Sequence, residues 1–240
     1  MSIEKFEVKG LGTIGVTDEL PYNEGICVLR EEGFDAISLR DLAFGRLYAG
    51  KSTRDFLRKN GTRTKEAVLY SGRDLLFLFD SPLLRQNEGL DAAVSATRLG
   101  QEIYFTDDFF EETKKTAKKD SHRLYKNRIV VFPNRRELRY QDKTGNMILP
   151  CFRIHEFTIP NWAFKDVAED YAQLMLKEGI NNLPIWIPDK DYLSTTHQPF
   201  LRQIWICCFG KTNNKEGVAG ISGNNRKLYE KDRLIGLRKE

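Results

Sequence analysis

The chain has 240 residues, of which 40% are apolar and 11% are aromatic, so it can fill one good hydrophobic core or two small ones and is neither disordered nor fibrous. Its 38 basic and 34 acidic residues leave a net charge of +4 at pH 7, which over this length does not by itself indicate a nucleic-acid-binding protein. No apolar run is long enough to span a membrane, and the N-terminus lacks the apolar stretch of a signal peptide, so we expect a protein of the cytoplasm or of a virion.

The cysteines and histidines form neither a metal-binding pattern nor a disulfide framework. The cysteines lack metal-ligand spacing, and no histidine has a second ligand at a useful interval. We therefore expect structural thiols, no metal and no cofactor. The neighbouring Cys207 and Cys208 fall in a predicted strand, so one thiol should be buried and the other exposed. The residues considered are Cys27, Cys151, Cys207 and Cys208, with His122, His155 and His197.

The first 80 residues are predicted to be mostly strand and turn. Gly10–Gly15 matches the glycine pattern of a dinucleotide-binding loop. However, Pro21 and Gly25 follow, and we expect no helix there to present its N-terminus to a pyrophosphate. A turn-rich hairpin, with glycines at positive φ angles, is the better interpretation.

A second glycine pattern, Gly45–Ser52, matches the phosphate-binding loop of nucleotide hydrolases letter for letter. In such a loop Lys51 would reach the β- and γ-phosphates and Ser52 would hold Mg²⁺, with Asp80 as the acidic partner. That chemistry needs a buried strand before the loop, but residues 38–44 carry a charged pair at their centre, which a strand covered on both faces rarely accepts. We interpret the match as fortuitous, and keep a P-loop nucleotide-binding hydrolase as the alternative function.

Local signals predict the elements of the middle of the chain. Apolar runs at 66–70 and 75–79 flank a tight connection that contains glycine, which predicts a hairpin. Apolar residues near a helical period predict a helix over 90–99 that Gly100 ends. Thr106 is a predicted N-cap for a helix to about Lys119, with acidic residues at its start and basic ones at its end.

Further strands and one further helix are predicted after these elements. Residues 162–178 carry an apolar stripe at helical spacing, and Gly179 should end that helix. The segment 183–188 contains two prolines, which predicts a strand at the edge of a sheet. The other short strands are expected at 103–105, 129–132 and 151–159.

These elements predict an α+β fold with short twisted antiparallel strands and two or three helices, and they argue against a doubly wound parallel sheet. We expect an N-terminal β-rich and helical portion over 1–120, which can belong to the same domain as the rest. The C-terminal portion, 121–240, is expected to be the ligand-binding region.

Residues 200–238 carry the most specific pattern of the chain. Short anchors alternate there with positions that tolerate many side chains, in the steps Phe200-x-Arg202-Gln203-x-Trp205, Arg226-x-Leu228 and Arg233-x-x-Gly236-Leu237-Arg238. This pattern resembles the C-terminal region of variable proteins of diversity-generating retroelements, in particular the archaeal and archaeal-virus group. The resemblance implies a C-type-lectin-like fold, which formylglycine-generating enzymes share.

The resemblance also implies a function and a set of site residues. Such a protein is a non-enzymatic binder whose variable segment, here about 205–238, contacts a protein or cell-surface ligand. Anchors Trp205, Leu228, Gly236 and Leu237 would belong to the rigid frame, and Arg226, Arg233 and Arg238 would donate hydrogen bonds within it. The ligand-facing residues would be Ile206, Cys207, Cys208, Lys211, Thr212, Asn213, Asn214, Lys215, Asn224, Asn225, Tyr229, Glu230, Lys231 and Asp232.

Composition of this segment agrees with the mechanism of such retroelements. Diversification acts at template adenines, and asparagine codons are rich in adenine, so the two Asn-Asn pairs at 213–214 and 224–225 suit it. Asn and Gly can also simply build turns, as they do in most proteins. Two further alternatives are an enzyme that uses Cys207 or Cys208 in the manner of formylglycine-generating enzymes, and a nucleic-acid binder. We expect neither, because the cysteines have no evident base and the basic and aromatic residues do not interleave.

Overall fold

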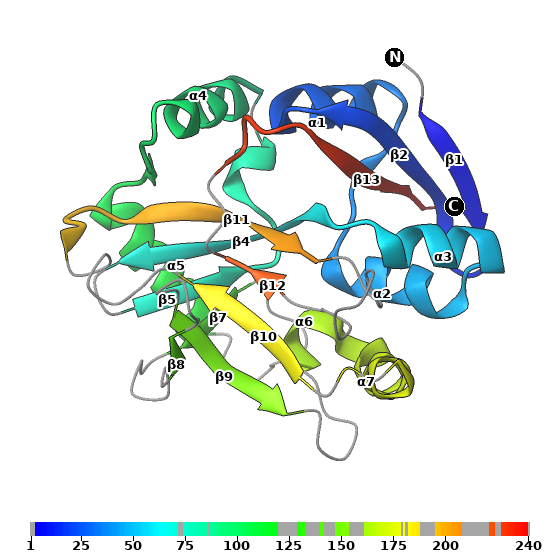
Figure 1. The fold of residues 1–240 in the computed structure, drawn as a ribbon. Coiled ribbons are helices and arrows are strands. Elements are labelled where there is room, and N and C mark those ends of the chain that lie inside the picture. The colour runs from blue at the N-terminus through cyan, green and yellow to red at the C-terminus, as the bar shows by residue number, and fades with distance from the viewer. Residues whose placement is uncertain are drawn as a thin grey trace.

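Figure 1 shows the computed structural model of the chain, in which two β-sheets organise the fold. The structure describes residues 3–71, 74–85, 87–119, 129–132, 140–141, 147–153, 161–178, 180, 182–187, 195–207, 221–223 and 227–239. All structural statements below refer to these residues.

The smaller sheet joins the two ends of the chain. Its strands lie in the order β1 (Glu4–Val8), β2 (Gly12–Leu20), β13 (Asp232–Arg238) and β3 (Asp35–Ala36). All neighbours are antiparallel, and β13 pairs with β2 through Ile235 opposite Val16 and Leu237 opposite Ile14. The C-terminal strand is therefore held between two strands from the start of the chain.

The larger sheet mixes strands from the whole chain. Strand β11 (Phe200–Ile206) pairs with β4 (Thr62–Ser71) along one edge, and with β12 (Ile221–Ser222) and β6 (Ile103–Tyr104). Beyond β4 lie β5 (Asp74–Leu78) and β7 (Ile129–Phe132). Beyond β12 lie β10 (Asn182–Ile187), β9 (Met147–Arg153) and β8 (Tyr140–Gln141).

Helices cover both faces of the larger sheet. Val68 and Tyr70 of β4 pack in a core with α2 (Leu39–Tyr48), α3 (Lys51–Lys59), α6 (Asn161–Phe164) and α7 (Ala168–Lys177). The alternate residues Ala67 and Leu69 pack in a second core with α1 (Tyr22–Glu31), α4 (Asn87–Arg98) and α5 (Asp107–Lys119). Since successive side chains of a strand point to opposite faces, β4 is buried on both sides.

The described part of the chain confirms the α+β class, but it contains more helices than the two or three predicted. Three of them, α1, α2 and α3, lie in the first 80 residues, where strand and turn were predicted. The prediction that no helix follows Gly10–Gly15 is wrong. Pro21 takes the N-cap position of α1, where its missing N–H does no harm. Gly25 leaves room for Leu234, because a Cβ there would come within 2.6 Å of Leu234 Cδ1.

Elements with strong local signals are confirmed. The hairpin of β4 and β5 has Tyr70 opposite Leu75. Helix α4 ends before Gly100, whose φ is +73°, and α5 begins after Thr106, whose Oγ1 accepts the Phe109 N–H at 3.2 Å. Gly10 and Gly12 have φ of +79° and +117°, as the turn interpretation of that segment requires. The strand expected at 129–132 is β7, and that at 103–105 is β6.

Three predicted elements differ from the structure. The helix expected over 162–178 is interrupted by a 3₁₀ turn at Lys165–Val167, where Lys165 has a φ of +52°. The strand near 183–188 is not at an edge, since β10 lies between β9 and β12. Pro184 is tolerated there because it falls where the register with β9 shifts, between Leu183 and Ile185. Strand β9 starts earlier than expected, at Met147, and residues 154–159 of that prediction lie outside the described residues.

Candidate functional site

The candidate ligand-facing residues lie in three segments, one after β11, one after β12 and one that leads into β13. The described chain stops at Cys207 just after β11 and resumes at Ile221, which pairs with Ile206. It stops again after Gly223 and resumes at Lys227, ahead of the turn that leads into β13. Strand β12 pairs with β11 in the larger sheet, whereas β13 belongs to the smaller sheet (Figure 1).

The anchors of the Phe-x-Arg-Gln-x-Trp step make the frame of this site. Phe200 stacks on Tyr70 with ring centroids 5.0 Å apart. The Arg202 guanidinium binds the Glu102 carboxylate with two hydrogen bonds, of 2.6 and 3.2 Å, and both side chains are buried. The Gln203 amide donates to the backbone carbonyl oxygens of Thr64 and Glu66 on β4. Each anchor therefore fixes β11 to a neighbouring element.

The last anchor of this step, Trp205, connects β11 to β13. Its indole N–H donates to Asp232 Oδ2 at 3.1 Å, and the same oxygen accepts from Arg63 Nη1 at 3.1 Å. Burial raises the pKa of the Asp232 carboxyl above its usual value, although Arg63 and Trp205 favour the charged form. Burial likewise lowers the pKa of the Arg63 guanidinium. Gly61 is required beside the indole, because a Cβ there would lie 2.6 Å from Trp205 Cζ2.

The turn before β13 has a fixed base and an exposed tip. Arg63 Nη2 donates to the Lys227 carbonyl oxygen at 2.7 Å, and the Tyr22 N–H donates to that of Leu228 at 2.9 Å. At the tip, Lys227 Nζ and Glu230 Oε1 form an exposed ion pair at 2.7 Å. The backbone of this turn is thus tied to the frame, while its charged side chains extend into solvent.

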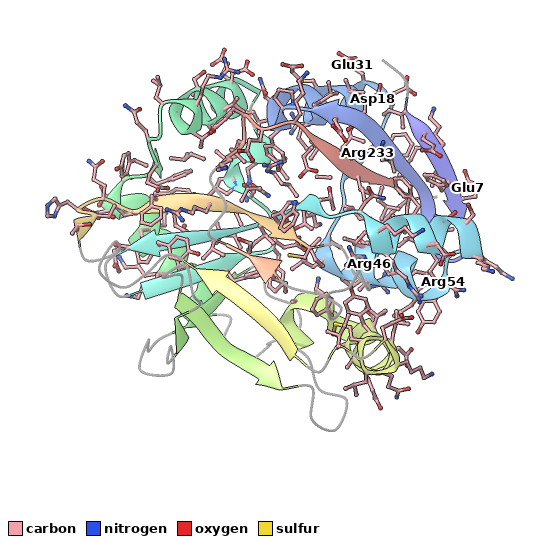
Figure 2. All side chains as sticks on the ribbon, in the orientation of Figure 1. Glu7, Asp18, Glu31, Arg46, Arg54 and Arg233 are labelled. Carbon is pink, nitrogen blue, oxygen red and sulfur yellow. The ribbon has the colours of Figure 1, made fainter. Side chains whose placement is uncertain are left out.

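Arg46 on α2 fixes the start of the other long segment. Its side chain is fully buried, and its donors bind four oxygens: those of the Leu57, Asn60 and Cys207 carbonyls at 2.9, 3.1 and 3.0 Å, and the Tyr171 hydroxyl at 2.8 Å. Figure 2 shows Arg46 on α2 and Arg233 on β13. Because Cys207 is the last described residue after β11, Arg46 holds the point from which the chain leaves this strand.

The candidate ligand-facing residues divide into three groups. The side chains of Ile206 and Cys207 are buried, with 2% and 8% of their surface exposed. Glu230 and Lys231 are exposed, and Tyr229 and Asp232 are half-buried. Outside the described residues lie Cys208, Lys211, Thr212, Asn213, Asn214, Lys215, Asn224 and Asn225.

The expected frame residues have environments of two kinds. Leu228 and Leu237 are buried, and Gly236 has no room for a side chain, since a Cβ would lie 2.7 Å from Leu29 Cδ2 and 3.0 Å from the Asp35 carbonyl oxygen. Arg233 and Arg238 are exposed, and their guanidinium groups lie over the rings of Phe56 and Phe34, at 6.0 and 5.0 Å from the ring centroids. Arg226 lies outside the described residues.

The segment Gly45–Ser52, which matches the P-loop pattern, spans the junction between two helices. Its first four residues are the end of α2, and Lys51 and Ser52 begin α3, so the segment contains no phosphate-binding loop between a strand and a helix. Gly45 instead allows these two helices to pack, because a Cβ there would come within 2.8 Å of Leu57 Cδ1. Asp80 forms an ion pair with Lys65 at 3.3 Å. The structure gives no support to a nucleotide site.

Several residues that build the site were not found from the sequence. Arg63 has no sequence motif, and Glu102 stands in a segment, 102–107, that resembles the same family of variable proteins only weakly; their partners are 164 and 100 residues away. The available signal was a charged residue inside an otherwise apolar segment, which usually has a buried partner. That signal identifies the residue but not what it binds.

Outside this region the described residues form a further cleft. In the described ranges no group of His, Cys, Asp and Glu could hold a metal ion, and no helix is long and apolar enough to cross a membrane. A cleft of about 360 Å³ lies among α1, β3 and the 3₁₀ turn Pro82–Arg85, lined by Ile26, Leu29, Phe34, Lys65 and Asp80 among others. None of the described candidate ligand-facing residues lines it.

Comparison with known proteins identifies the fold. No protein-family model and no curated protein matches the chain. Among solved structures, the chain is similar to one described as showing the accommodation of massive sequence variation in Nanoarchaeota by the C-type lectin fold. The TM-score is 0.59 at 15% sequence identity, and the match covers 99% of this chain and 98% of that chain. The chain therefore has a C-type lectin fold, as its sequence pattern predicted.

Proposed function

We propose that this protein is a non-enzymatic binder that recognises a protein or cell-surface ligand with a diversified surface formed by its C-terminal segment, about 205–238. We call this surface the display surface. It consists of Cys208, Lys211, Thr212, Asn213, Asn214, Lys215, Asn224, Asn225, Tyr229, Glu230 and Lys231.

The observation that carries the proposal is the separation of fixed and exposed residues within one short stretch of chain. Trp205, Leu228 and Gly236 are held by packing or hydrogen bonds, whereas Glu230 and Lys231, between them in sequence, are exposed. A surface that must change its side chains without unfolding needs this separation, because exposed positions away from special contacts change stability little. The likeness to a C-type lectin fold that accommodates massive sequence variation agrees with it.

Three of the residues predicted to face the ligand are left out of the display surface. Ile206 and Cys207 are buried, and the Asp232 carboxylate is engaged by Trp205 and Arg63. A side chain that already packs in the core or holds the frame contributes poorly to an external contact. We assign these three to the frame.

The chemistry of the display surface suits recognition of varied protein surfaces. Asparagine and threonine side chains give adaptable hydrogen bonds, and Tyr229 offers an aromatic anchor, the combination that antibody binding sites use. We propose that retroelement-directed mutagenesis at template adenines diversifies these positions. The two Asn-Asn pairs support that mechanism, because asparagine codons are rich in adenine.

A display library tests the binding function. In one library the display surface is randomised, and in a matched library the same number of exposed positions on α4 and α5, far from it in sequence, is randomised. Selection against a panel of cell surfaces and purified proteins should enrich binders from the first library only. Equal enrichment from both libraries, or enrichment from neither, would contradict the proposal.

A further inference from the structure

Each of the three segments of the display surface begins at a carbonyl oxygen that a buried side chain holds. Arg46 Nη2 donates to the Cys207 carbonyl at 3.0 Å, immediately before the segment with Cys208 and Lys211 to Lys215. The Tyr70 hydroxyl donates to the Gly223 carbonyl at 2.8 Å, immediately before Asn224. Arg63 Nη2 donates to the Lys227 carbonyl at 2.7 Å, two residues before Tyr229.

The three donors belong to the rigid part of the molecule. Arg46 and Tyr70 are fully buried, and Arg63 is 3% exposed. Arg46 comes from α2 and the other two from β4, so none belongs to the segments that they hold. Arg46 is fixed by its bonds to the Leu57 and Asn60 carbonyls, Tyr70 by stacking on Phe200, and Arg63 by its ion pair with Asp232.

The acceptor in all three cases is a main-chain oxygen. Every residue type has a backbone carbonyl group, so such a bond does not depend on the side chain at that position or at its neighbours. A bond to a side-chain acceptor would be lost whenever the side chain changed. The three contacts therefore hold the starting points of the display segments in a way that sequence variation in those segments does not remove.

We propose that Arg46, Tyr70 and Arg63 are positioning residues that keep the base of the display surface in place whatever side chains it carries. This inference rests on the proposed function, since it explains how one frame can carry many surfaces. It predicts that the loss of a donor loosens the segment that follows its acceptor. It also predicts that this loss makes the fold sensitive to which residues that segment contains.

The cleanest test compares two Tyr→Phe variants. Tyr70→Phe removes the hydroxyl that donates to the Gly223 carbonyl and keeps the aromatic ring. Tyr22→Phe is the matched control, because Tyr22 is also fully buried and its hydroxyl has no hydrogen-bond partner among the described residues. Amide hydrogen exchange of the peptide 221–229 should rise by about two- to tenfold in Y70F, the range that one lost hydrogen bond corresponds to, and stay unchanged in Y22F.

A second comparison uses arginines. Arg63→Lys and Arg46→Lys keep the charge but cannot reach all the oxygens that the guanidinium groups bind. Arg202→Lys is the control, since that arginine is also buried and its guanidinium binds the Glu102 carboxylate with two hydrogen bonds. Into each background we place exposed substitutions such as Glu230→Ser and Lys231→Glu. In the wild type and in R202K, each exposed substitution should change the melting temperature by no more than a few degrees. In R63K, the changes in melting temperature should differ more widely from one substitution to the next.

These readouts need no ligand, so they separate this inference from the proposed function. If Y70F and R63K leave exchange in the display segments unchanged, or if Y22F and R202K raise it equally, the positioning role is wrong even when binding is found. If no ligand is found but the local effects appear, the display function fails and the positioning role stands. Should R46K not fold, Y70F and R63K still decide the matter.

Discussion

Two ion pairs of nearly equal length contrast the buried frame with the exposed turn before β13. Arg202 and Glu102 lie 2.6 Å apart with 4% and 2% of their side chains exposed, whereas Lys227 and Glu230 lie 2.7 Å apart with 57% and 46% exposed. A buried pair leaves an uncompensated charge when one partner is removed, but an exposed pair is replaced by water. The frame should therefore resist substitution, and the display surface should accept it.

The largest effect is expected for Glu102→Ala. The variant leaves the buried Arg202 guanidinium without its carboxylate, which should lower the free energy of unfolding by about 3–5 kcal/mol. Urea unfolding measured at pH 7 tests this value. A loss below about 1 kcal/mol would show that the pair is not buried in solution and would weaken the comparison.

The next effect concerns pH and a second buried carboxyl group. Burial raises the pKa of Glu66 to about 7 from 4.5, although the Leu39 N–H donates to both its oxygens. Between these values the folded protein binds the proton and the unfolded chain does not. The stabilisation that proton binding by Glu66 adds to the free energy of unfolding is thus fully present below about pH 4.5. It is lost as pH rises through about 7, a change of about 3 kcal/mol.

Glu66→Gln should remove that pH dependence. The difference in unfolding free energy between E66Q and the wild type, measured in urea at several pH values from 4.5 to 8, should shift in favour of the variant as pH rises. A difference that stays constant over this range would show that Glu66 titrates at its ordinary pKa.

A smaller effect is expected where the frame meets the display surface. Trp205→Phe keeps an aromatic ring but removes the indole N–H that binds Asp232 at 3.1 Å. Loss of one such hydrogen bond should lower the free energy of unfolding by about 1–2 kcal/mol. The exchange rate of amides at 232–234 should rise with it; equal rates in both proteins would mean that Trp205 does not hold β13.

The smallest effect is expected for Lys227→Ala, in the display turn itself. Its ion pair with Glu230 is exposed, and the Lys227 carbonyl that Arg63 holds is present in alanine as well. The urea midpoint should not change measurably. A clear loss of stability would show that this exposed pair supports the frame.

The sequence predicted elements whose signals are local and missed those fixed by distant partners. Thr106 and Gly100 identify their helix ends by their own chemistry, and both were predicted correctly. Helix α1 was missed because Pro21 and Gly25 weaken its local signal, while Leu234, more than 200 residues away, explains Gly25. Pro184 led to the wrong prediction of an edge strand. Only the register shift with β9 shows how a proline fits inside the sheet.

The candidate site was predictable in part for the same reason. The anchor pattern from Phe200 to Arg238 predicted the fold, and burial of Leu228 and Leu237 agrees with the frame role expected for them. The sequence could not predict that Asp232 belongs to the frame while its neighbour Lys231 is exposed. That difference depends on Arg63 and Trp205, which bind the Asp232 carboxylate and lie elsewhere in the chain. Whether a position is free to vary is a property of its contacts and not of its own residue type.

If one short segment combines a fixed frame with diversified positions, as proposed, the division should be visible in its codons. The encoding locus should be compared codon by codon from Trp205 to Arg238 across several isolates. We expect substitutions confined to adenine positions at display residues such as Asn224, Glu230 and Lys231. We also expect unchanged codons for Trp205, Asp232 and Gly236, and a near-copy of the segment beside a reverse-transcriptase gene. Substitutions spread evenly over frame and display codons, with no such neighbouring gene, would contradict the proposed diversification.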